Sequence, residues 1–350
     1  MSPTRVMVVE DSPTVRELLC EIIARDPRLE VCAAVKNGEE ALRLLERVSP
    51  DIVSLDINLP GMNGLEVAER IMSEQPTPIV VIAASDTAGE QTLSLQALAA
   101  GALSVVEKPR GATAAHAYDA LSARICTHLA IMSQVKVVRQ RHRRSPRLPD
   151  SGLALPASGP FAALGIVCSM GGPPSLVRIF NSLGAEFPLP ILLVQHITPL
   201  FLSGFASWLA GAGPFAVETV TGKRTLRPGT IYVAAPDLHL RATRAGVDAV
   251  GGEPVDGHRP SGSVLFESLA AEFGPRAIGA LLTGMGEDGA LGLLALKRAG
   301  GYTLTESKNT AVVYGMPAAA VGLQAERESL PLDEIASRIK ELTALRGAAV

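Results

Sequence analysis

Short apolar runs rich in β-branched residues alternate with amphipathic stretches of helical periodicity, and this alternation restricts the possible folds most strongly. Parallel strands that are buried on both faces read as continuous apolar runs, and helices must cover both faces of such a sheet. The sequence therefore predicts a doubly wound α/β architecture. The alternation stops between residues 136 and 160 and then resumes, which indicates two domains.

The first part of the chain, from Arg5 to about Gln134, contains five such units. Its expected strands are Val6–Val9, Val31–Val35, Ile52–Leu55, Ile79–Ala83 and Ser104–Glu107. An amphipathic helix is expected between the first two of them, with Ser12 as N-cap and Pro13 at the first helical position. We expect a small five-stranded doubly wound domain over residues 4–128.

The interruption has its own composition, with a basic cluster followed by residues that break regular structure. The basic residues are Lys136, Arg139, Arg141, Arg143, Arg144 and Arg147, and Pro, Ser and Gly dominate from Pro146 to Pro160. No aromatic residues are interleaved with this cluster and no helix-turn-helix lies beside it, which argues against nucleic-acid binding. Residues 129–160 are therefore interpreted as a solvated linker or as a docking strip for an acidic partner.

The second part, over residues 161–345, resumes the α/β alternation and predicts a second doubly wound parallel sheet. Its strand candidates are Ala163–Cys168, Ile191–Gln195, Ile278–Thr283 and Tyr302–Thr305, with helices such as Phe201–Ala210 and Ala290–Ala299. The section from about 213 to 262 is richer in Pro and Gly, and we expect a hairpin around Thr230–Ala234 and loops there.

Bulk properties agree with a cytoplasmic protein of two domains. A length of 350 residues exceeds what one core usually holds, and 32 basic against 35 acidic residues do not indicate a partner of one charge sign. Four cysteines are scattered without metal-ligand spacing, which favours a reducing compartment and no structural metal. No signal peptide or membrane-spanning run is present, so we expect no membrane insertion.

Acidic residues follow two strands of the first domain at the point where each strand ends. Glu10 and Asp11 close the first strand and Asp56 closes the third, so a doubly wound sheet brings them together at its carboxyl edge. An acidic pair at one strand end is usually a solvated loop. Three carboxylates in one pocket instead need a cation, and such oxygen ligands suit Mg²⁺. Lys108, followed by Pro109, would reach in to pair with an anion on Asp56.

These segments resemble the receiver domain of bacterial response regulators, which has a flavodoxin-like fold. The matching residues are Val8-Val9-Glu10-Asp11-Ser12, Leu55-Asp56-Ile57-Asn58-Leu59-Pro60-Gly61-Met62-Asn63-Gly64 and Glu107-Lys108-Pro109. The resemblance implies that Asp56 accepts a phosphoryl group from a sensor histidine kinase. It also implies that Glu10, Asp11 and Asp56, with the backbone carbonyl of Asn58, surround the Mg²⁺. The family's switch hydroxyl falls on Ala84, with Ser85 one place later.

A serine, a histidine and an aspartate follow strands of the second domain. Ser169 precedes Met170-Gly171-Gly172-Pro173-Pro174, which predicts a tight turn into a helix whose N–H groups can stabilise an oxyanion. The G-x-S-x-G pattern is absent, because Val167 stands at its first glycine. His196 and Asp288 follow two other strands. Each residue alone is usually structural, but the three together predict a serine triad.

The second domain resembles the catalytic domain of the chemotaxis methylesterase (CheB) family. The matching segments are Ser169-Met170-Gly171-Gly172, Gln195-His196-Ile197-Thr198-Pro199, Tyr232-Val233-Ala234-Ala235-Pro236, His258-Arg259-Pro260-Ser261, Leu282-Thr283-Gly284-Met285-Gly286-Glu287-Asp288-Gly289 and Val313-Tyr314-Gly315-Met316-Pro317. The resemblance implies that Ser169 is the nucleophile, His196 the general base and Asp288 the orienting carboxylate. It implies hydrolysis of glutamyl methyl esters and deamidation of glutamines on methyl-accepting chemoreceptors, without a cofactor in this domain.

The chain departs from that family at several positions, namely at Val167-Cys168-Ser169-Met170, Thr198-Pro199-Leu200-Phe201 and Glu306-Ser307-Lys308. Two other function classes remain open from the sequence. The second domain could bind receptors without turning them over, and the complete set of Ser169, His196 and Asp288 favours catalysis over that alternative. A DNA-binding response regulator would need a recognition helix, for which the sequence gives no signal.

Overall fold

A computed structural model describes residues 2–84, 88–108, 115–135 and 161–347. The chain divides into two compact units, Met1–His142 and Arg143–Val350, which we call the N-terminal and the C-terminal unit. Most of the expected linker, residues 136–160, lies outside the described residues, as do Ser85 and Pro109. No helix among the described residues is long and apolar enough to cross a membrane.

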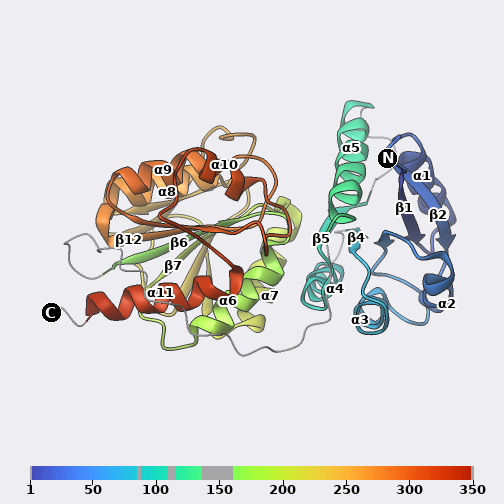
Figure 1. Cartoon of the computed structure of the whole chain (residues 1–350), viewed down its shortest axis with the longest axis horizontal. Helices are drawn as coiled ribbons and strands as arrows, with labels where there is room; N and C mark the ends of the chain where they lie inside the picture. Colours follow the sequence, from blue (N-terminus) through green and yellow to red (C-terminus); the bar gives the residue numbers. More distant parts are fainter. Residues whose placement is uncertain (1, 85–87, 109–114, 136–160, 348–350) are drawn as a thin grey trace. The chain divides into compact units, whose positions relative to one another are not determined.

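The N-terminal unit is a five-stranded parallel sheet with helices between its strands (Figure 1). Its strands are β1 (Thr4–Val9), β2 (Leu29–Val35), β3 (Ile52–Leu55), β4 (Ile79–Ala83) and β5 (Ser104–Glu107). Its helices are α1 (Pro13–Ala24), α2 (Gly38–Val48), α3 (Gly64–Glu74), α4 (Ala88–Ala99) and α5 (Ala115–Met132). All five expected strands are confirmed, and helix α5 continues past residue 128, where the first domain was expected to end.

Local sequence explains how helix α1 begins. The Ser12 side chain accepts a hydrogen bond from the Val15 N–H, and Pro13 occupies the first turn, as expected. Leu19, Ile22 and Ile23 form the buried face of the helix. The helix therefore starts directly after Asp11 and holds the end of β1 in place.

The strand order β2-β1-β3-β4-β5 determines where this unit can carry a site. Strand β2 lies on one side of β1 and strands β3 to β5 lie on the other, so the order in which strands are added reverses between β1 and β3. Ligands of doubly wound sheets bind at the carboxyl ends of the strands beside such a reversal. Strands β1, β3 and β4 are almost wholly buried and form the core of the sheet. Residues that follow β1 and β3 consequently meet at this edge.

The C-terminal unit contains a larger parallel sheet and a separate hairpin. The sheet strands are β6 (Ala163–Cys168), β7 (Ile191–Gln195), β8 (Ala216–Val220), β9 (Thr230–Ala234), β12 (Ala277–Leu281), β13 (Tyr302–Glu306) and β14 (Glu328–Leu330). The hairpin pairs β10 (His239–Thr243) with β11 (Gly246–Val250). The helices are α6 (Gly172–Leu183), α7 (Pro199–Ala212), α8 (Gly262–Glu272), the 3₁₀ helix η1 (Gly274–Arg276), α9 (Ala290–Arg298), α10 (Met316–Gly322) and α11 (Leu332–Gly347).

Helices cover both faces of this sheet, as a doubly wound fold requires. Figure 1 shows α8, α9 and α10 on one side and α6, α7 and α11 on the other. The strand order is β14-β13-β12-β6-β7-β9-β8, so the reversal point lies between β12 and β6. The segments that follow β12, β6 and β7 therefore converge at one edge.

One strand expectation is wrong. Thr230–Ala234 does not form a hairpin but is β9, which pairs in parallel with both β7 and β8. The hairpin of this region lies further on, between His239 and Val250. Turn-forming residues on both sides of β9 suggested a local antiparallel pairing, whereas packing against the central sheet determined the actual partners.

Candidate functional site

Ser169, His196 and Asp288 lie at the same edge of the C-terminal sheet, where backbone hydrogen bonds join their segments. The His196 N–H donates to the Cys168 carbonyl over 3.0 Å, and the Ser169 N–H donates to the Thr283 carbonyl over 3.0 Å. The ends of β6, β7 and β12 are thus connected directly. This arrangement brings the three predicted residues onto one rim.

The histidine and the aspartate are in direct contact. The Nε2 atom of His196 lies 2.8 Å from Oδ2 of Asp288, and Asp288 is only 2% exposed. The other ring nitrogen of His196, Nδ1, is buried and has no hydrogen-bond partner among the described residues. With Nε2 occupied by the carboxylate, Nδ1 is the nitrogen that can take a proton from a nucleophile.

Asp288 also accepts hydrogen bonds from the start of helix α8. The donors are the Ser261 hydroxyl at 2.7 Å, the Gly262 N–H at 2.6 Å and the Ser263 N–H at 3.0 Å. Burial opposes ionisation, but the bonds from His196, Ser261 and Gly262 prevail and lower the pKa of Asp288 well below its ordinary value. The carboxylate therefore stays charged and can orient the imidazole. Ser261, which the sequence did not single out, is the N-cap of α8.

The predicted tight turn after Ser169 is present and requires glycine. Gly171 has φ of 76°, a conformation that residues with a Cβ atom rarely adopt. A Cβ atom on Gly172 would lie 2.2 Å from the Gln195 side-chain oxygen. Helix α6 begins here, but its first turn does not offer the expected free N–H groups. The Gly172 N–H donates to the Ser169 carbonyl over 2.9 Å, and the next two residues are prolines, which have no N–H. No hydrogen bond joins the Ser169 hydroxyl to His196 among the described residues, as is common in free enzymes.

A second histidine covers one face of His196. The rings of His196 and His258 are stacked with centroids 3.9 Å apart and planes within 4°. Burial and then the neighbouring His196 lower the pKa of His258, so it packs as a neutral ring. His258 belongs to one of the segments that carry the family resemblance, but no sequence signal predicted its stacking on His196. Its contact helps to fix the plane of the His196 imidazole.

The acidic residues of the N-terminal unit also meet as expected. Carboxylate oxygens of Glu10, Asp11 and Asp56 all lie within 4.8 Å of one another. The Lys108 ammonium lies 2.9 Å from Glu10 Oε2 and 2.8 Å from Asp56 Oδ2. Asn58 follows Asp56 closely, and its N–H donates to Asp56 Oδ1 over 3.2 Å. We call Glu10, Asp11 and Asp56 the acidic cluster.

Burial dominates the electrostatics of the acidic cluster. Burial and the nearby Asp56 raise the pKa of Glu10 to about 7. Burial also raises the pKa of Asp56, against the opposing charge of Lys108. For Lys108 burial acts in the other direction, but the carboxylates of Asp56 and Glu10 outweigh it and raise its pKa. The lysine is therefore firmly charged, whereas burial shifts Glu10 and Asp56 toward their neutral forms.

These residues fit a divalent cation. The acidic cluster offers only oxygen donors, at separations that one ion can bridge, and one lysine does not neutralise three carboxylates. Its chemistry suits Mg²⁺ in particular, because this ion accepts a few carboxylates together with waters and phosphate oxygens. Ala84, the position at which the resemblance places a switch hydroxyl, follows β4 and carries no hydroxyl.

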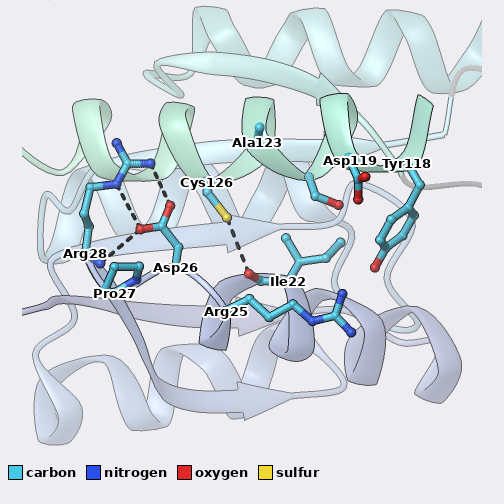
Figure 2. A pocket seen from close by; sticks show the side chains of 10 residues that line it. Ile22, Arg25, Asp26, Pro27, Arg28, Tyr118, Asp119, Ala123 and Cys126 are labelled. Atoms are coloured by element: carbon cyan, nitrogen blue, oxygen red, sulfur yellow. Dashed lines mark hydrogen bonds and ion pairs between the residues drawn. The ribbon is translucent and has the colours of Figure 1, made fainter. Parts of the chain in front are cut away.

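A separate hollow in the N-terminal unit contains none of the predicted site residues. It encloses about 350 Å³ between α1 and α5 and is lined by Ile22, Arg25, Asp26, Pro27, Arg28, Tyr118, Asp119, Ser122, Ala123 and Cys126. Figure 2 shows that Arg28 is paired with Asp26 there and that the Cys126 thiol donates to the Ile22 carbonyl. Burial raises the pKa of this thiol to about 11, so it is a poor nucleophile.

Comparison with family models matches both units. The CheB methylesterase model matches residues 164–339, and the response regulator receiver domain model matches residues 6–118. The second match covers all three residues of the acidic cluster and Lys108. The first covers Ser169, His196 and Asp288.

Relatives are similar to this chain over almost its whole length. Protein-glutamate methylesterase/protein-glutamine glutaminase 2 of Paramagnetospirillum magneticum is 49% identical over 342 residues, covering 97% of each chain. Protein-glutamate methylesterase/protein-glutamine glutaminase 1 of Syntrophus aciditrophicus is 42% identical, and the match covers 97% of this chain and 98% of the relative. Enzyme 4 of the same name from Myxococcus xanthus is 41% identical, covering 99% and 98%. The chain therefore belongs to the CheB methylesterase family and carries a response regulator receiver domain before its methylesterase domain.

Proposed function

We propose that this protein is a cytoplasmic, phosphorylation-regulated hydrolase that removes methyl groups from glutamyl methyl esters of chemoreceptors and deamidates selected glutamines. The observation that carries the proposal is the buried Asp288, which accepts four hydrogen bonds and holds His196 at the rim that bears Ser169. The carboxylate orients the imidazole, and the imidazole has one free nitrogen. This is the division of roles that a serine hydrolase needs.

Catalysis would begin when the Ser169 hydroxyl oxygen attacks the ester carbonyl carbon and His196 takes the hydroxyl proton on Nδ1. The carbonyl oxygen becomes an oxyanion, which backbone N–H groups of the turn between Ser169 and α6 can stabilise by about 3–4 kcal/mol each. Collapse of the intermediate breaks the bond to the methoxy group, and the imidazolium gives its proton to release methanol. Asp288 stabilises the imidazolium throughout because its own pKa is lowered.

Deacylation repeats the sequence with water as nucleophile. His196 takes a proton from the water, whose oxygen attacks the acyl carbon. The bond to Ser169 then breaks, the serine regains a proton from the imidazolium, and a glutamate side chain is released. With a glutamine substrate the same steps apply, except that the first leaving group is ammonia. Neither reaction needs a cofactor in this domain.

Regulation would come from the receiver domain, with Asp56 accepting a phosphoryl group from a sensor histidine kinase. Glu10, Asp11 and Asp56, with the Asn58 carbonyl, would hold Mg²⁺, which when bound neutralises charge on the transferred phosphoryl oxygens. Lys108, already ion-paired with Asp56, would pair with the phosphoryl group once Asp56 is modified. Burial gives these charges more effect on one another than they would have in water.

Methanol release from membranes that contain methylated receptors tests the proposal. We expect release by the wild-type protein, an increase with a phosphodonor such as acetyl phosphate, and essentially none from Ser169→Ala. Ser182→Ala, an exposed serine on helix α6, is the matched control and should behave as wild type. A Ser169→Ala protein that kept more than about a hundredth of the turnover would refute the nucleophile, because triads contribute far more than that. Receptor binding without any methanol release would favour a non-catalytic module.

A further inference from the structure

A carboxyl group that the mechanism does not use lies beneath the catalytic rim. Glu306 ends strand β13 and is 0% exposed. Its Oε2 atom accepts a hydrogen bond from the Thr283 N–H over 2.9 Å. Its Oε1 atom is buried without a hydrogen-bond partner among the described residues. Fully buried glutamates are rare unless they are paired or neutral.

Thr283 connects this carboxyl group to the nucleophile. Its carbonyl accepts the Ser169 N–H over 3.0 Å, and its hydroxyl donates to the Met170 carbonyl over 2.8 Å. The same hydroxyl accepts the Val313 N–H over 2.9 Å. The backbone on both sides of the Ser169–Met170 bond is therefore held by one residue, whose own N–H is held by Glu306.

Few charges are available to stabilise an anion at Glu306. Burial raises its pKa to about 7, against hydrogen bonds from Thr283 and Thr310. Arg178 of α6 attracts the anion, but it is half exposed and ion-paired with Asp333 of α11, which repels it. The surroundings consequently contain no dedicated counter-ion among the described residues.

Other titratable groups on the elements around β13 are engaged elsewhere. Glu328 of β14 and Arg338 of α11 pair with each other at 2.7 Å. Lys297 of α9 donates to two backbone carbonyls, and helix α10 contains no titratable side chain. Burial, and then the nearby Glu306, raise the thiol pKa of Cys168 of β6 well above its ordinary value, so the thiol stays neutral. None of these groups therefore balances a charge on Glu306.

We propose that Glu306 is a positioning residue, which acts through Thr283 and supports the working arrangement of Ser169 only in its neutral form. The inference rests on the proposed hydrolase function. When Glu306 ionises, a buried negative charge forms two hydrogen-bond steps from the serine whose attack creates an oxyanion. Like charges in a protein interior disfavour each other. Burial removes the ionised carboxylate from water and leaves its stabilisation to the Thr283 N–H and the Thr310 hydroxyl.

The consequence is a loss of turnover as pH rises through about 7. A histidine base alone gives the opposite behaviour, a rise to a plateau as the imidazole loses its proton. The stability of the folded protein should also fall as pH rises. Because the folded-state pKa lies above the ordinary 4.5, stability falls between pH 4.5 and about 7 and changes no further above that window.

The test is kcat/KM for methanol release between pH 5.5 and 9 by the full-length protein, its Glu306→Gln variant and a Glu267→Gln control. Glutamine keeps an oxygen for the Thr283 N–H but cannot ionise, and Glu267 is exposed on α8. We expect wild type and control to lose about tenfold in rate by pH 8.0, as one ionisation predicts. Glu306→Gln should keep its plateau. Equal alkaline loss in Glu306→Gln and wild type would overturn the inference.

Thermal unfolding separates this inference from the proposed function because it needs no activity. The melting temperature of wild type should fall between pH 5 and pH 8 relative to that of Glu306→Gln. If Glu306→Gln failed to fold, the wild-type rate profile would decide alone, and a plateau up to pH 9 would refute the positioning role. If no variant released methanol at any pH, the hydrolase function itself would be wrong, whatever the melting temperatures show.

Discussion

Asp56 of the receiver domain and Asp288 of the methylesterase domain occupy comparable places in two different sheets. Each follows a parallel strand next to the point where the strand order reverses, and each is 2% exposed. Their pKa values are nevertheless shifted from the ordinary value in opposite directions. The pKa of Asp56 is raised, whereas the pKa of Asp288 is lowered.

Hydrogen-bond donors explain the difference. Asp288 accepts four hydrogen bonds, from two N–H groups, a hydroxyl and the imidazole. Asp56 accepts one N–H from Asn58 and shares the Lys108 ammonium with Glu10. Burial penalises both anions, but only the donors around Asp288 outweigh that penalty.

The contrast corresponds to the two chemical tasks that we propose for these residues. Asp288 must remain a fixed anion while a neighbouring imidazole gains and loses a proton, so its environment is complete within the protein. Asp56 must react, and a carboxylate that is not fully stabilised by the protein has more to gain from a cation and from modification. Preorganisation thus distinguishes an orienting residue from a reacting one.

Asp288→Asn should produce the largest effect, a loss of about ten-thousandfold in kcat for methanol release. The amide cannot stabilise the imidazolium and favours the wrong tautomer of His196, which has this cost in serine triads. Steady-state rates on receptor membranes would measure it. A loss below about tenfold would mean that His196 does not depend on Asp288, and the comparison with Asp56 would lose its meaning.

Asp56→Asn should abolish phosphorylation by a labelled phosphodonor and leave methanol release without phosphodonor unchanged. The acceptor oxygen is removed, but the catalytic rim belongs to the other unit. Glu69→Gln, at an exposed position of α3, is a suitable control and should be labelled normally. Label appearing on Asp56→Asn at wild-type levels would exclude Asp56 as the acceptor.

The same two substitutions should change stability with opposite signs. Asp288→Asn leaves at least one buried donor without an acceptor and should lower the free energy of unfolding by about 1–3 kcal/mol. Asp56→Asn removes an anion whose pKa burial has raised and should increase it by about 1–2 kcal/mol at pH 7 without Mg²⁺. Denaturant unfolding, followed for each unit by hydrogen exchange, would show this. Destabilisation by both would contradict the pKa contrast.

The positions of both sites could be predicted from the sequence because strand ends are a local pattern. Runs such as Ile52–Leu55 and Ile191–Gln195 identify a strand, and parallel strands bring their carboxyl ends to one edge whatever the loops do. Glu10, Asp56 and Lys108 accordingly meet, and so do His196 and Asp288. The roles assigned to them stay predictions.

The surroundings of the sites could not be predicted, because they depend on segments that are distant in sequence. Ser261 bonds Asp288 across 27 positions, and His258 stacks on a histidine from another strand end. Neither contact leaves a periodic signal. The hairpin predicted around Thr230–Ala234 was wrong for the same reason. Strand β9 pairs in parallel with β7 and β8, and the turn-forming residues that flank it do not indicate these partners.

Removal of the receiver domain should give the smallest effect and would test whether the methylesterase site is complete by itself. Residues 148–350 contain the whole hydrogen-bond set of Asp288, so this fragment should be active, and several-fold more active than the unphosphorylated full-length protein. A tethered receiver has a high effective concentration near the rim and can cover it without a large interface. On this hypothesis, phosphorylation would shift an equilibrium between open and closed forms. Because Ala84 lacks the switch hydroxyl, the phosphorylated full-length protein should be activated less than the fragment.

Equal rates for the fragment and the unphosphorylated protein, on the same receptor membranes, would show that the receiver does not inhibit and would leave recruitment to receptors as its role.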